Sequence, residues 1–97
     1  RGVQSVTLKV KAKGTYRVRL HFLEPDRLAE RGRVFDIMLN GKPAQRGFDI
    51  AAAAGSSRRS VIRDFEVDAP KGIVLVGLRP VAGLPPVLSG IEWTPLP

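Results

Sequence analysis

The chain has 97 residues, of which 43% are hydrophobic, and a formal net charge of +7. This length suits one domain with a single core and excludes two, and the hydrophobic content argues against disorder. The absence of cysteine excludes disulfides, thiol nucleophiles and thiolate metal sites, and no apolar run approaches the roughly 20 residues of a membrane-spanning helix.

Alternating apolar and polar residues predict short strands along the whole chain. In chain order the predicted strands are 5–11, 16–23, 34–39, 44–50, 61–67, 73–78 and 87–93. The segment IVLVGL (73–78) is apolar on both faces, which is typical of a central strand. The alanines before Gly55 can form one helical turn, and RPVAGLPP (79–86) is expected to be a loop rich in proline and glycine. This pattern predicts an all-β fold, an antiparallel β-sandwich of about seven strands.

The first two strands are predicted to lie in different sheets. A hairpin around Gly14 would set Lys9 directly opposite Arg19, and like charges in that position destabilise a sheet. The conflict disappears if the chain arches over, so that the apolar faces of the two strands meet in the core.

Asn40-Gly41 follows the strand at 34–39 and predicts a tight hairpin turn. Both residues tolerate a positive φ, which the two-residue turns between antiparallel strands require. We expect Asn40 or Gly41 to have a positive φ.

The residue spacing shows no catalytic constellation. Glu24 and Asp26 are the pair of acids that glycoside hydrolysis would need, but two acids beside a proline more often position a loop. The only histidine, His21, lies on the solvent side of its strand and is interpreted as a surface residue; alone it cannot form an ordinary zinc site. Serine-nucleophile, calcium-loop and phosphate-loop patterns are absent. The sequence therefore predicts no enzyme, no metal site and no cofactor.

The excess of basic residues favours three classes of binding partner: nucleic acid, acidic polysaccharide and a membrane surface. The alternative is that these basic residues only form a solvated outer face of the domain. Single-strand nucleic-acid binders expose aromatic residues between the basic ones. Tyr16, Phe22, Phe35 and Phe65 instead fall on inward strand positions, so nucleic acid is disfavoured, and no membrane insertion is expected.

Several motifs in order carry a resemblance to a known family. From Gly14 to Trp93, the segments GTYRVRLHFLE, RVFDIMLNGKP, FDI, FEV and PPVLSGIEW resemble the malectin family of carbohydrate-binding domains. The resemblance implies a galactose-binding-like β-sandwich of jelly-roll type that is non-catalytic and binds no cofactor. It also implies covalent neighbour domains, often glycoside hydrolases, in a protein that is secreted, periplasmic or at the cell surface.

The chain also departs from the family pattern. Family domains are longer at the start, so residues 1–97 are expected to be a single domain that lacks the N-terminal part and belongs to a larger protein. The sugar-binding member has two aromatic residues where this chain has Asp26 and Arg27, and an acid where it has Gly83. The segment FLEPDRLAERGRVFDI looks more like bacterial members.

The resemblance places sugar contacts at the sandwich end that follows the strand 16–23. The ligand-binding residues expected there are Glu24, Asp26, Arg27 and Arg58. The alternative is that Glu24 and Arg33 only brace the loop, and Asp36 and Asp49 are interpreted as structural. Because arginine pairs bidentately with carboxylate or sulfate, an anionic glycan suits these loops better than a neutral one.

The first functional hypothesis is a non-catalytic carbohydrate-binding-like module that positions a larger protein on a glycan or polysaccharide. The alternative is a structural or protein-interaction sandwich that has lost the sugar site.

Overall fold

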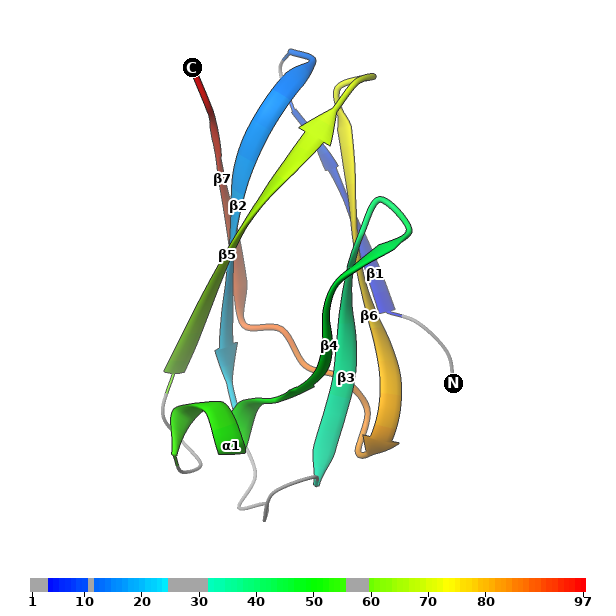
Figure 1. Cartoon of the computed structure of the whole chain (residues 1–97), viewed down its shortest axis with the longest axis vertical. Helices are drawn as coiled ribbons and strands as arrows, with labels where there is room; N and C mark the ends of the chain where they lie inside the picture. The colour runs from blue at the N-terminus through cyan, green and yellow to red at the C-terminus, as the bar shows by residue number, and fades with distance from the viewer. Residues whose placement is uncertain (1–3, 11, 25–31, 56–59) are drawn as a thin grey trace.

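Two antiparallel sheets packed face to face form the domain (Figure 1). The computed structural model describes residues 4–10, 12–24, 32–55 and 60–97. One sheet has the strand order β1-β6-β3-β4 and the other the order β5-β2-β7. The elements are β1 (Gln4–Lys9), β2 (Gly14–Leu23), β3 (Arg33–Leu39), β4 (Lys42–Asp49), α1 (Ile50–Ala54), β5 (Ser60–Ala69), β6 (Ile73–Gly83) and β7 (Gly90–Pro95). The predicted all-β sandwich is confirmed.

The first two strands lie in different sheets, as predicted. β1 pairs with β6, where Lys9 is opposite Ile73. β2 is the middle strand of the other sheet, where Arg19 is opposite Asp64 on one side and Glu92 on the other. Each basic side chain thus avoids a like charge across the strand.

The turn at Asn40-Gly41 is also as predicted. Asn40 has φ 52° and Gly41 has φ 81°, the combination that a type I′ turn requires. The turn joins β3 to β4, and the Asn40 side chain adds two bonds: Nδ2 donates to the Asp68 carbonyl at 2.8 Å and Oδ1 accepts from the Leu75 N–H at 2.9 Å.

The core lies between the sheets, and aromatic rings join them. Phe22 of the three-stranded sheet lies with its ring centroid 4.8 Å from that of Phe48 and 5.8 Å from that of Phe35, both in the four-stranded sheet. Tyr16 is buried as well and Phe65 is partly buried. The prediction that these aromatic side chains point inward is confirmed.

The short helix α1 has a cap at each end. The Asp49 carboxylate accepts a hydrogen bond from the Ala52 N–H at 3.2 Å, and Gly55 ends the helix with φ 82°. The predicted helical turn ending at Gly55 is therefore confirmed, and so is the structural role of Asp49.

The predicted loop at 79–86 was wrong in its first half. β6 lies between β1 and β3, as a central strand should, but it continues to Gly83 and pairs with β3 as far as Arg33. A register shift next to Phe35 accommodates Pro80, because proline is tolerated beside bulges and where one side of a strand is unpaired. The local proline and glycine signal was overridden by pairing with a strand that is distant in the sequence.

Candidate functional site

A buried ion pair closes the end of the sandwich where β2 ends. The Arg33 guanidinium binds the Glu24 carboxylate through Nε at 2.9 Å to Oε1 and through Nη2 at 3.1 Å to Oε2. Arg33 Nη1 also donates to the Pro85 carbonyl. Glu24 is 1% exposed and Arg33 4% exposed, so this clamp ties the end of β2, the start of β3 and the segment after β6 together.

The clamp favours the bracing interpretation of Glu24 over direct contact with a ligand. A carboxylate held by both oxygens on a buried guanidinium has its charge compensated inside the protein. The ligand-binding role of Glu24 stays a prediction.

The other three predicted site residues, Asp26, Arg27 and Arg58, lie outside the described residues. The structure does describe residues next to these segments, and two of them are paired. Leu23, at the end of β2, is the pairing partner of Ser60, at the start of β5. The Gly32 carbonyl accepts a hydrogen bond from the Leu84 N–H at 2.9 Å, which fixes the chain just before β3.

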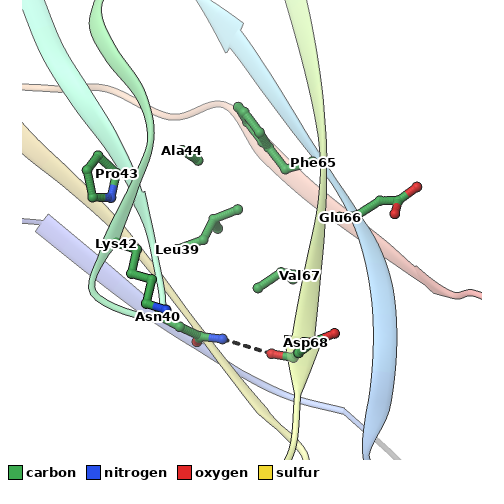
Figure 2. A pocket seen from close by; sticks show the side chains of 9 residues that line it. All are labelled: Leu39, Asn40, Lys42, Pro43, Ala44, Phe65, Glu66, Val67 and Asp68. Atoms are coloured by element: carbon green, nitrogen blue, oxygen red, sulfur yellow. Dashed lines mark hydrogen bonds between the residues drawn. The ribbon is translucent and has the colours of Figure 1, made fainter.

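A groove of about 440 Å³ opens on one side of the sandwich, between β4 and β5. These are the edge strands of their sheets. Figure 2 shows Phe65 and Val67 projecting from β5 toward Leu39, while the Glu66 side chain points away. The groove is lined by Leu39, Asn40, Lys42, Pro43, Ala44, Phe65, Glu66, Val67 and Asp68.

Sequence reasoning did not single out this groove. A usable signal was present, because Asp64, Glu66 and Asp68 alternate with the apolar residues Phe65 and Val67. What the pattern does not reveal is that β5 lies at a sheet edge with its inward residues partly uncovered.

The outer face of the three-stranded sheet carries a ladder of opposite charges. Arg19 binds Asp64 through Nε at 2.8 Å and Nη2 at 3.1 Å. This hydrogen bond to Arg19 lowers the pKa of Asp64 and raises that of Arg19. His21 Nε2 lies 2.5 Å from Glu92 Oε2, and its side chain is 32% exposed, which confirms the placement of His21 on the outer face.

Asp36 has a structural role, as predicted. Its carboxylate accepts from the Gly47 N–H at 2.9 Å and from Arg79 Nη2 at 2.7 Å. The hydrogen bond from Arg79, followed by that from Gly47, lowers the pKa of Asp36. The carboxylate therefore supports β4 where its pairing with β3 shifts register.

The described residues form neither a metal-binding cluster nor a membrane-spanning helix. No group of three or more His, Cys, Asp or Glu side chains in that part of the chain could hold a metal ion. No helix formed by those residues is long and apolar enough to cross a bilayer.

Known proteins resemble this chain both in sequence and in fold. Receptor-like protein 4 of Arabidopsis thaliana is 32% identical over 88 residues, which is 89% of this chain and 14% of that protein. A structure of the plant peptide RALF23 in complex with FER and LLG2 matches 94% of this chain and 26% of its own chain, with a TM-score of 0.84 and 26% identity. The ANX1 ectodomain from Arabidopsis thaliana matches 94% of this chain and 27% of its own, with a TM-score of 0.80 and 20% identity, and supports the fold alone.

This chain spans only about a quarter or less of each of these proteins. The Malectin domain model matches residues 4–82, most of the chain. The sandwich and its motifs agree with that match, and the chain belongs to the malectin domain family.

Proposed function

We propose that this malectin-family domain is a non-catalytic binding module of an extracellular protein. The proposed ligand is an anionic glycan, bound at the end of the sandwich where β2 ends and β5 begins. The larger protein would be positioned on the glycan by this contact.

The observation that carries the proposal is the pairing of Leu23 with Ser60. Arg27 and Arg31 follow Leu23 closely in the sequence, and Arg58 and Arg59 directly precede Ser60. Two arginine-bearing segments thus depart from neighbouring points on one sheet. Such a cluster suits carboxylate or sulfate groups, because the guanidinium fork pairs with them bidentately.

The clamp beneath this end supports the same proposal. Glu24 pairs with Arg33 inside the protein, which fixes the chain at the point where the first arginine-bearing segment begins. We propose Asp26, Arg27 and Arg58 as direct contacts, and Glu24 as the residue that holds the first segment in place.

Affinity electrophoresis against a polysaccharide panel tests this function. A polyuronate or sulfated polysaccharide should retard the domain at low salt, and moderate salt should weaken the retardation because exposed charges are screened. Arg27→Ala and Arg58→Ala should each reduce it. Lys71→Ala removes one positive charge from the turn at the opposite end of β5 and should leave it unchanged.

Two results would contradict the glycan proposal. One is tight, salt-insensitive binding to a neutral glucan. The other is salt-sensitive retardation by every polyanion, DNA included, that all three variants share, which would show only that the domain is basic.

One observation favours the alternative, a protein- or peptide-binding domain. The structure that contains the plant peptide RALF23 with FER and LLG2 is 26% identical to this chain over the matched region. Binding of this kind would persist at salt concentrations that abolish retardation by a polyuronate.

A further inference from the structure

We propose that the groove between β4 and β5 binds an extended peptide, which adds to β5 as a further strand. The peptide that fits alternates apolar and basic side chains. This site lies along the edge of β5, is built entirely from described residues, and does not depend on glycan binding at the end of the sandwich.

The backbone of β5 offers hydrogen bonds along this edge. The Thr15 and His21 carbonyls of β2 accept from Leu96 and Ser89, on the β7 side. The residues paired with them, Asp68 and Ile62, therefore direct their backbone groups away from β2, and so do Asp64 and Glu66 between them. The Asn40 side chain confirms this direction, because it donates to the Asp68 carbonyl.

The unpaired stretch is short and has defined ends. Asn40 occupies the Asp68 carbonyl and Arg63 Nη1 occupies the Ile62 carbonyl at 3.1 Å. Between them, no described residue outside β5 forms a hydrogen bond to the backbone of Asp64 or Glu66. The N–H and C=O groups of these two residues can pair with an added strand, which is the binding mode of peptides at open sheet edges.

The inward side of the groove is apolar. Phe65 and Val67 are only partly buried, and their side chains point toward Leu39 (Figure 2). Pro43 and Ala44 of β4 form the facing wall. Alternate side chains of an added strand would enter this space and cover Phe65 and Val67, which supplies the apolar half of the peptide pattern.

The outward side is acidic. Asp64, Glu66 and Asp68 follow one another on the outer face of β5, and Glu66 makes no ion pair with any described residue. On its other flank β5 already pairs with β2, where Arg17 faces Glu66 and Arg19 faces Asp64. A strand added at the open edge would meet the same acids, so Lys or Arg at its outward positions gives favourable cross-strand pairs.

The same acids disfavour a second copy of β5 as the occupant. Antiparallel pairing of β5 with itself would bring carboxylates together across the strands, which destabilises a sheet. The facing strand β4 is a poor place for addition because Pro43 has no N–H to donate.

The probe is the capped peptide acetyl-KVRVKV-amide, titrated into the labelled domain at physiological salt and followed by amide NMR. Saturable shifts should centre on Asp64, Glu66 and the groove residues. A dissociation constant of about 0.1–1 mM is expected, because few hydrogen bonds and side chains take part. The peptide of the same composition in the order KKRVVV should bind at least about tenfold more weakly, because its charges and apolar groups cannot alternate between the two faces.

Methylation of the peptide backbone separates strand addition from attraction by charge. In an antiparallel pairing, the Lys and Arg residues opposite Asp64 and Glu66 donate their N–H groups to β5, whereas the Val N–H groups point away. N-methylation of the basic residues should therefore abolish binding, and N-methylation of the valines should preserve it. Parallel pairing would reverse the two results, and loss in only one of the two analogues supports strand addition.

Protein variants locate the site. Glu66→Lys should weaken peptide binding at least about tenfold by placing a like charge beside the added strand. Glu66→Gln, which keeps the shape of the side chain, should weaken it less. The matched control is Glu92→Lys, the same charge reversal on the outer face of β7, which should bind the peptide as the parent does.

The proposal is overturned if both methylated analogues bind equally well, or if Glu66→Lys and Glu92→Lys behave alike. Concentration-dependent shifts without peptide would show that a second copy occupies the edge and would also overturn it. Loss of glycan binding in Arg27→Ala with unchanged peptide binding would separate the two sites.

Discussion

Single polar residues join segments of this domain that are far apart in the sequence. Asn40 bonds β3 and its turn to β6 through Leu75 and to β5 through Asp68. Arg33 joins Glu24 to Pro85 across the end of the sandwich. Among the described residues, every buried side-chain nitrogen and oxygen has a hydrogen-bond partner, so these residues satisfy one another while they fix the segments.

Substitution of Gly41 tests whether the hairpin turn requires a positive φ at this position. Its φ of 81° lies in a region that a β-branched residue rarely adopts, and no atom crowds the position. Gly41→Val should therefore lower the free energy of unfolding by about 1 kcal/mol or more through backbone strain alone. Gly41→Ala should cost less. Denaturant unfolding measures both, with Gly90→Ala as the control, since Gly90 has no positive φ and its Cβ would meet His21 only at 3.8 Å. Equal stability of Gly41→Val and the parent would count against this turn.

Removal of only one partner of the Glu24–Arg33 ion pair should destabilise the domain more than removal of both. Arg33→Met leaves the Glu24 carboxylate buried without its guanidinium, and such a change costs about 3–5 kcal/mol. The double variant Glu24→Leu/Arg33→Met removes both charges and should be less destabilised than Arg33→Met alone. A double-mutant cycle by urea unfolding measures the coupling; additive losses would show that the two side chains act independently.

At the level of elements, strand position decides which charges meet. Arg17 and Arg19 belong to β2, which lies between two strands that carry Asp64, Glu66 and Glu92. The outer face of the three-stranded sheet is therefore mixed in charge, although the whole chain carries +7. The open acidic edge of β5 follows from the same arrangement.

The Asp36 carboxylate, which supports the irregular pairing of β3 with β4, should make the stability of the domain depend on pH. The folded-state pKa of Asp36 is lowered by Arg79 and the Gly47 N–H. The stabilisation is therefore fully present above the unfolded pKa, about 3.9, and is lost as the pH falls through the lower folded value. Asp36→Asn should be less stable than the parent at pH 7 and should lose less stability between pH 7 and pH 3. Urea midpoints at several pH values measure this, and parallel curves for the two proteins would contradict it.

At the level of the whole molecule, one aromatic cluster couples the two sheets. Phe22 comes from the three-stranded sheet, and Phe35 and Phe48 come from the other. Arg63 adds a contact from β5, with its guanidinium carbon 5.3 Å from the Phe48 ring centroid. The two sheets therefore pack against each other through these side chains in the core, while a groove remains between β4 and β5.

Truncation of this cluster should destabilise both sheets together. Phe22 is fully buried, and removal of a buried phenylalanine costs about 3–5 kcal/mol from lost burial and the cavity left behind. Phe22→Ala should lower the thermal midpoint in one cooperative transition. Ile73→Ala, on the outer face and 45% exposed in the parent, should change it far less. Separate transitions for the two sheets would contradict the coupling.

Local pattern was sufficient for much of the fold. The inward positions of Tyr16, Phe22 and Phe35 could be read from alternation, because successive side chains of a strand point to opposite faces. The Asn40-Gly41 turn could be read from two residues that tolerate a positive φ. The repulsion that a hairpin would create between Lys9 and Arg19 was sufficient to predict that the first two strands lie in different sheets, because it disfavours one pairing relative to another.

What depends on partners distant in the sequence was decided only by the tertiary structure. The strand β6 continues through Pro80 because β3 lies beside it, and Glu24 is buried because Arg33 and the segment at Pro85 close over it. The position of β5 at a sheet edge, and with it the groove at Phe65, follows from the order of strands in two sheets. Alternation determines the two faces of each strand, but the strand that covers an edge is set by long-range packing, which residue spacing does not encode.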